Sequence, residues 1–226
     1  MNASSRTVVM AAVGLFVVAA VGYVGYSAFK TRELNKTSLA ALTDTNARLR
    51  EALSIEVGPP PGDRAQIVKK LDEHAAAADQ HLKEFKRLDA ARNQALADAA
   101  DYYLLGAREI LKKQADSHRY RLAFGESSGT LREHMRSDNR TSAWVQQAVK
   151  VKERVNKDYR GYNLNAVALG QFLETLSTAQ KRIAPYVDPS ALIAEDLIAR
   201  AHKQVVEETE RTEAVMEKLN RLGSIR

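Results

Sequence analysis

The sequence predicts an all-α protein in which an N-terminal transmembrane helix precedes an elongated antiparallel helical bundle or coiled coil of three to four long helices. Its five prolines occupy only positions 59, 60, 61, 185 and 189. The long tracts between them are rich in Ala, Leu, Glu, Lys and Gln, which are strong helix formers. A hydrophobic fraction of 45% and a charged fraction of 27% are typical of a folded chain rather than a disordered one.

Residues 1–29 are expected to form the membrane anchor. The segment from Val8 to Phe29 has 22 residues and no charge. As a helix it would be about 33 Å long, which is enough to cross the hydrocarbon core of a bilayer. The small-residue pattern Val18-Ala19-Ala20 lies inside the run rather than after it, so cleavage by a signal peptidase is not favoured. We predict a retained, single-pass anchor in the inner (cytoplasmic) membrane.

The flanking charges bear on the side of the membrane that holds the rest of the chain. Lys30, Arg32 and Lys36 follow the apolar run, whereas Arg6 is the only charged side chain before it. Counted alone, this bias favours a cytoplasmic C-terminal domain. Long domains behind an N-terminal anchor cross the membrane largely regardless of charge. We predict a periplasmic or extracytoplasmic domain, with the cytoplasm as the alternative.

Residues 30–55 predict a juxtamembrane heptad helix. Leu39, Asn46 and Leu53 take the a positions and Leu42 and Leu49 the d positions of a coiled-coil seam. The same register extends back into the apolar run, where it meets small residues that let helices approach closely. The seam could suit a parallel homodimer, but the polar residues Arg32, Asn35 and Asn46 within it count against one. Chance alignment, or packing against later helices of the same chain, is the favoured alternative. The predicted interaction seam comprises Gly14, Val18, Val21, Gly25, Asn35, Leu39, Leu42, Asn46, Leu49 and Leu53.

Residues 56–63 read EVGPPPGD and predict a proline-rich turn. Residues 64–226 follow as the helical bundle. A tract without proline predicts its first helix over 64–124, with Asp63 and Gln66 as a capping box at the start. The string GESSG at 125–129 is typical of a loop, and Thr130 with Glu133 could cap the next helix.

The second bundle helix is predicted over 130–184. An unbroken heptad row supports it: Ala148, Val155, Tyr162, Leu169, Leu176 and Ile183. Asp188-Pro189 then resembles an N-cap with proline at the first helical position, so we expect the last helix over 189–223. The short link between these two helices makes them antiparallel neighbours.

The sequence does not favour an enzyme, a metal site or a cofactor. It contains no cysteine, and none of its histidines stands in the ExxH pattern of a bundle metal site. His74 and His81 share a helix face, but a solvated polar face is the simpler interpretation. GESSG matches the string of a nucleophile elbow at Ser127, yet that elbow requires a turn from strand to helix.

A basic cluster near position 118 is the one candidate contact patch outside the seam. It comprises Lys112, Lys113, His118, Arg119 and Arg121. Such a patch could bind phosphate or lipid headgroups, although basic residues also serve to complement the dipole at a helix end. The formal net charge of +6 comes with an acidic C-terminal segment, which favours complementary helix faces rather than nucleic acid as partner.

These observations predict a membrane-anchored helical scaffold or assembly subunit of a bacterial envelope complex. Its partners would be the membrane and other protein subunits, contacted through coiled-coil faces. Two other classes remain open: a helical ligand-binding sensor domain tethered to the membrane, with Tyr102, Tyr103, Tyr159 and Tyr162 as possible pocket residues, and a tethered hydrolase that rests on GESSG alone.

Overall fold

The computed structural model describes residues 3–55, 61–88, 93–137 and 141–222, with residues 3–25, 61, 62 and 222 described as backbone only. These residues form α-helices joined by short links, with no strand among them, so the all-α prediction is confirmed. The elements are α1 (Ala3–Leu53), α2 (Pro61–Phe85), α3 (Gln94–Arg136), α4 (Ser142–Ile183), the 3-10 turn η2 (Pro189–Ala191) and α5 (Glu195–Leu222).

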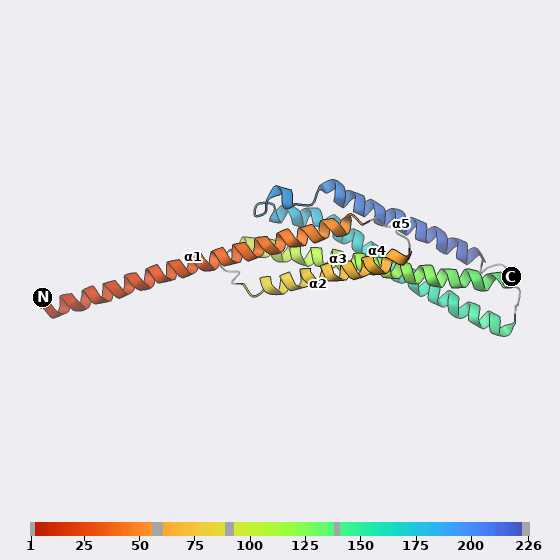
Figure 1. Ribbon diagram of the computed structural model, residues 1–226, viewed down its shortest axis with the longest axis horizontal. Coiled ribbons are helices and arrows are strands. Elements are labelled where there is room, and N and C mark those ends of the chain that lie inside the picture. The colour runs from red at the N-terminus through yellow and green to blue at the C-terminus, as the bar shows by residue number, and fades with distance from the viewer. Residues whose placement is uncertain (1–2, 56–60, 89–92, 138–140, 223–226) are drawn as a thin grey trace.

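The bundle is built on the antiparallel pair α3 and α4 (Figure 1). These helices have 43 and 42 residues, so each is about 60 Å long. The second half of α1, together with α2, packs on α3, and α5 packs mainly on α4. The first half of α1 projects beyond the other helices as a single rod (Figure 1).

Two hydrophobic clusters hold these helices together. The larger lies where α1, α2, α3 and α4 meet, and it includes the fully buried side chains of Leu42, Leu71 and Leu104. The smaller lies toward the α3–α4 turn and includes Phe124 and Val155. The second cluster draws on α3, α4 and α5 only, because α1 and α2 do not extend so far along the bundle.

The prediction of one helix over 64–124 is wrong. α2 ends at Phe85, and α3 begins at Gln94 after Asn93, whose side-chain oxygen accepts a hydrogen bond from the Leu96 amide at 3.3 Å. This N-cap lets the chain reverse. The reversal lays the apolar face of α2 against that of α3, which a single rod of the same sequence could not do.

The predicted loop at 125–129 is also wrong, because GESSG lies inside α3, which continues to Arg136. The hydroxyl groups of Ser127 and Ser128 donate to the carbonyls of Phe124 and Gly125 at 3.4 and 3.1 Å. Each glycine costs a helix about 1 kcal/mol, and burial of Phe124 and Leu131 in the smaller cluster offsets that cost. Ser127 is buried within a helix, so it is not placed as an exposed nucleophile.

The second helix, predicted over 130–184, begins at Ser142 instead, because residues 130–136 belong to α3. From Val155 on, the heptad row of α4 faces the core as expected. Its members Val155, Tyr162, Leu169, Leu176 and Ile183 are buried. Gln180, a polar residue in the neighbouring row, is buried as well. Its side chain pairs twice with the backbone of Ile193, donating to the carbonyl at 3.0 Å and accepting from the amide at 2.6 Å. Gln180 therefore fixes the link between α4 and α5.

The last helix begins at Glu195 rather than at residue 189. Asp188 does act as an N-cap, but for the short turn η2, where its carboxylate accepts from the Ser190 amide at 2.8 Å. Arg50 of α1 donates to three carbonyls of this link, those of Ser190, Ala191 and Leu192, at 3.0, 3.3 and 2.9 Å. Contacts to α1 and α4 hold the link extended before α5 starts.

The uncharged run Val8–Phe29 lies within the helix α1. Within the part of the chain whose side chains are described, no helical segment is long and apolar enough to cross a membrane. Positions 8–25 of the run fall outside that part. The transmembrane anchor therefore stays a prediction.

Candidate functional site

The outer half of the predicted interaction seam lies inside the chain. Leu42, Asn46, Leu49 and Leu53 are at most 2% exposed. The Tyr103 hydroxyl of α3 donates a hydrogen bond to the side-chain oxygen of Asn46. Since these residues pack on α2 and α3, they cannot also face a second copy, and the parallel-dimer seam is wrong over this stretch.

Of the remaining seam residues, two lie at the edge of the bundle, and the side chains of the other four are not described. Leu39 is partly buried against the larger cluster, and the Asn35 side chain accepts from the Asn93 side chain at 3.3 Å. Both positions therefore serve contacts within the chain. Gly14, Val18, Val21 and Gly25 lie outside the residues whose side chains are described.

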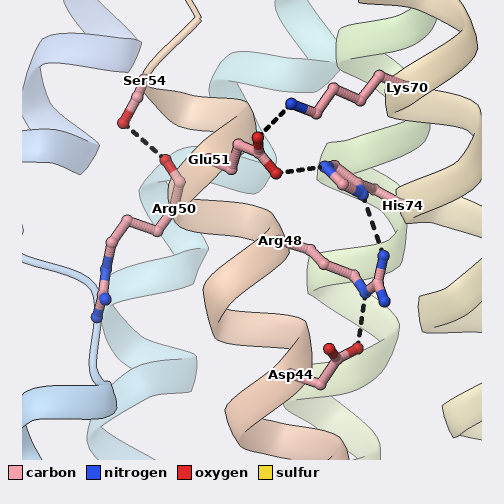
Figure 2. A network of polar contacts seen from close by, with 7 residues as sticks. All are labelled: Asp44, Arg48, Arg50, Glu51, Ser54, Lys70 and His74. Atoms are coloured by element: carbon pink, nitrogen blue, oxygen red, sulfur yellow. Dashed lines mark hydrogen bonds and ion pairs between the residues drawn. The ribbon is translucent and has the colours of Figure 1, made fainter.

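A network of polar side chains joins α1 to α2 next to the buried seam (Figure 2). Arg48 donates to Asp44 at 2.7 Å and to Nδ1 of His74 at 3.2 Å. Arginine can only donate, so Nδ1 of His74 is an acceptor and its Nε2 carries the proton that is donated to Glu51 at 2.9 Å. Lys70 pairs with the other oxygen of Glu51.

His81 extends the network, with its Nε2 2.8 Å from Asp44. Burial acts to raise the pKa of Asp44, but hydrogen bonds from Arg48 and His81 outweigh it and the pKa is lowered. His74 and His81 do share a helix face, and each is paired with a carboxylate of α1. No group of three or more metal-ligating side chains occurs among the described residues. The network thus attaches α1 to the bundle.

The predicted basic patch does not form one surface. Lys112 and Arg119 are exposed, and Arg119 pairs with Asp72 and, at 2.6 Å, with Asp116. His118 is buried, and Arg121 pairs with Glu208 of α5. The reason is the helical period, which turns positions 118 and 121 toward the bundle and 112 and 119 toward solvent. Lys113 is half-buried, and its carbonyl accepts from Asn165 at 2.8 Å.

Arg121 instead belongs to a cleft of about 520 Å³ between the start of α2, the second half of α3 and the second half of α5. We call this the arginine cleft. Its lining residues are Arg64, Arg121, Leu122, Phe124, Gly125, Glu126, Ser128, Arg132, Glu208, Arg211, Thr212 and Val215. The arginine cleft is therefore lined by four guanidinium groups and two carboxylates.

The charges in the arginine cleft are incompletely balanced. Glu208 is only 5% exposed and pairs with both Arg121 and, at 3.6 Å, Arg211. Arg64 and Arg132 form no ion pair with any residue that the structure describes. Burial and then the field of Arg121 lower the pKa of Arg64, which is the response expected of a cation short of counter-charge.

A smaller inner pocket of about 40 Å³ adjoins the arginine cleft and shares Arg121 and Glu208 with it. His118, Gln114 and Tyr162 line it from α3 and α4. Nδ1 of His118 and the side-chain oxygen of Gln114 have no hydrogen-bond partner within the described part of the chain. Burial, followed by the fields of Arg64 and Arg121, lowers the pKa of His118 to about 4.

The sequence predicted Arg121 and His118 as part of a surface patch and Tyr162 as a possible pocket residue, but not that the three would line adjoining hollows. Arg64, Arg132 and Arg211 come from three helices whose arrangement depends on the reversal before Asn93. One feature of the sequence does point to a buried ion pair on the last helix. Glu208 follows Val205 and precedes Thr212 at helical spacing, so it falls on the apolar face of the last helix, where a buried carboxylate requires a cationic partner.

The comparisons with known proteins give no relative for this chain. No family model matches it, and neither a curated protein nor a solved structure does.

Proposed function

We propose that the protein is a single-pass, membrane-anchored helical scaffold or assembly subunit of a bacterial envelope complex. The observation that carries this proposal is the continuity of α1, which runs from Ala3 to Leu53 as one helix. Its first half contains the uncharged run, and its second half supplies Leu42 and Leu49 to the core. Anchor and bundle would then share one helix, which holds the bundle at a fixed height above the membrane.

The place where α1 leaves the bundle supports a membrane boundary at the end of the uncharged run. Leu34 is 1% exposed, whereas Phe29 and Tyr26 are 63% and 57% exposed. Aromatic side chains are enriched where transmembrane helices cross the headgroup region. Lys30 and Glu33 follow at once and form an ion pair at 2.8 Å. Residues 26–33 would form the segment between the bilayer and the bundle.

Exposed aliphatic side chains support the assembly part of the proposal. On α4, Leu164 is 75% exposed and Val167 lies three residues on, so the two share a helix face. Val145 and Val149 form a second exposed pair near the start of α4. Contiguous exposed apolar side chains mark protein contact surfaces, whereas single ones are common on any protein. With the seam of α1 used inside the chain, we propose that α4 makes the contacts to partner subunits.

The anchor is tested by alkaline extraction of membranes that contain the full chain or a variant lacking residues 1–29. We expect the full chain to stay with the membrane and the variant to be released with its helical circular dichroism intact, because the core begins at Leu34. Release of the full chain, or a membrane-extracted species whose mass begins at Val21 or later, would contradict the anchor.

The assembly role is tested by a photo-crosslinking amino acid placed singly at Leu164 or Val167, with Lys69 and Glu73 of α2 as exposed control positions. The proposal predicts crosslinks to discrete envelope proteins from α4 and none from α2. Equal yields at all four positions would count against a specific partner.

The side of the membrane is tested by a reporter that is active only outside the cytoplasm and is fused at Arg226. We expect the fusion to be active, because the bundle is proposed to lie outside the cytoplasm. A stable but inactive fusion would place the bundle in the cytoplasm.

A further inference from the structure

The arginine cleft carries more positive charge than the described residues around it neutralise. Glu208 is shared between two arginines, and Arg64 and Arg132 are left without an ion pair among the described residues. Arg64 is half-buried, and a half-buried cation without a partner is costly unless it serves an interaction, whereas Arg132 is exposed at the edge of the cleft. Guanidinium groups bind phosphate and carboxylate through paired hydrogen bonds. The charge of the cleft therefore fits an anion.

The cleft also has an apolar wall. Phe124 and Val215 line it from α3 and α5, and Leu122 adds a third apolar side chain. A volume of about 520 Å³ is far larger than an inorganic anion needs and is within the range of small-molecule sites. Arginines beside an apolar wall suit a ligand that has an anionic group on an apolar body.

The position of the cleft favours a soluble ligand over a membrane lipid. The start of α2 and the second halves of α3 and α5 all lie on the side of the bundle away from the N-terminus (Figure 1). Phe29 and Leu53 are 24 positions apart in α1, which is a rise of about 36 Å. A headgroup of a bilayer that ended near Phe29 would not reach the cleft.

We propose that the arginine cleft is a binding site for a small soluble organic anion, a phosphate ester or carboxylate, whose charged group is held by Arg64, Arg121 and Arg132 and whose apolar body lies against Phe124 and Val215. The charge and shape of the site do not depend on the membrane anchor, whereas the choice of a soluble ligand over a lipid rests on the anchor proposed above. It gives the chain a ligand-binding activity in addition to its role as a scaffold.

The inner pocket would respond to such a ligand. Arg121 and Glu208 line both hollows, so an anion on Arg121 also weakens the field that this arginine exerts on His118. The Nδ1 atom of His118 has no partner in the described residues, so a water or a ligand atom can bind there. Anion binding should therefore raise the pKa of His118 from about 4, so that binding takes up protons near and just above that pH.

The test is calorimetric titration of the full chain in a non-ionic detergent with phenyl phosphate, benzoate and inorganic phosphate. Phenol serves as the neutral control, and dihexanoyl phosphatidic acid represents a lipid headgroup. The double variant Arg64→Gln with Arg132→Gln removes the unpaired cations. A double variant of Arg154→Gln and Arg200→Gln, both exposed and outside the cleft, is the matched control.

We expect saturable binding of phenyl phosphate or benzoate, weaker binding of inorganic phosphate and none of phenol. The cleft variant should bind at least tenfold more weakly, and the control variant within twofold of the natural chain. Circular dichroism checks that both variants fold. The proposal is overturned if neither organic anion binds at millimolar concentration, if both double variants lose binding equally, or if phosphatidic acid binds more tightly than either soluble anion.

Discussion

Asn46 lies 1% exposed among the leucines of α1, and its partner is the hydroxyl of Tyr103 rather than an asparagine of a second chain. Burial raises the pKa of Tyr103, so the phenol stays protonated and remains a donor. His118 is a second buried polar residue that affects stability. Burial and two arginines lower its pKa, and its Nδ1 has no hydrogen-bond partner among the described residues. The Asn46–Tyr103 hydrogen bond and the pKa of His118 therefore make the stability of the bundle depend on buried polar groups as well as on apolar packing.

Replacing Tyr103 by Phe should destabilise the bundle. The substitution keeps the ring but leaves the buried oxygen of Asn46 unpaired, which costs about 1–3 kcal/mol. Urea unfolding of the chain in detergent, followed by circular dichroism, measures the change. Adding Asn46→Leu should recover much of the loss, because it removes the unpaired group. A free energy of unfolding unchanged by Tyr103→Phe would contradict the proposed pairing.

Lowering the pH should weaken the fold through His118. Its pKa in the folded chain is about 4, below the ordinary 6.5, so the unfolded chain binds the proton first as the pH falls. Stability from this residue is complete above pH 6.5 and is lost between pH 6.5 and 4, by about 3 kcal/mol at most. The variant His118→Gln should show a shallower slope of unfolding free energy in that window. Identical slopes would refute the assignment.

At the scale of helices, the periodic pattern predicted which faces are buried better than where helices end. The heptad row of α4 is buried from Val155 to Ile183, because packing on a long neighbour imposes that period. The break before Asn93 and the continuation of α3 through GESSG were missed. Both depend on tertiary packing, since a cap or a single glycine shifts local preference by only about 1 kcal/mol.

Replacing Gln180 by Met should loosen the link between α4 and α5. The change leaves the buried amide and carbonyl of Ile193 without their partner, so we expect a loss of about 2 kcal/mol or more. The neighbouring exposed substitution Lys181→Met is the control and should change stability by less than about 0.5 kcal/mol. Urea unfolding measures both, and equal effects would show that Gln180 has no special role.

Single cysteines at positions 42, 46 and 49 should not cross-link between copies of the chain under mild oxidation, because these positions pack inside the bundle. The native chain has no cysteine that could interfere. A cysteine at Leu164 provides an exposed comparison that reacts readily with thiol reagents. Efficient dimer formation through 42, 46 and 49 would mean that α1 leaves the bundle and that the seam does form a parallel pair.

At the scale of the whole molecule, α1 connects the predicted membrane anchor to the helical bundle. Its first half carries the uncharged run, and its second half is fixed by buried leucines, by Arg50 on the α4–α5 link and by the Asp44–Glu51 network on α2 (Figure 2). The helix segments that line the arginine cleft, the start of α2 and the second halves of α3 and α5, lie at the end of the bundle away from the N-terminus (Figure 1). The cleft could not be predicted from the sequence, because its arginines meet only after α2, α3 and α5 have packed.

The most direct test of the shared anchor and core is a thiol-accessibility scan of α1 in intact membranes, with single cysteines at Val17, Lys36 and Leu49 and a membrane-impermeant reagent. We expect Lys36→Cys to react, whereas Val17→Cys and Leu49→Cys should be protected. Urea should then expose position 49, which is buried by the bundle, but not position 17, which is buried by lipid. Reaction of Val17→Cys as fast as Lys36→Cys would contradict the membrane anchor.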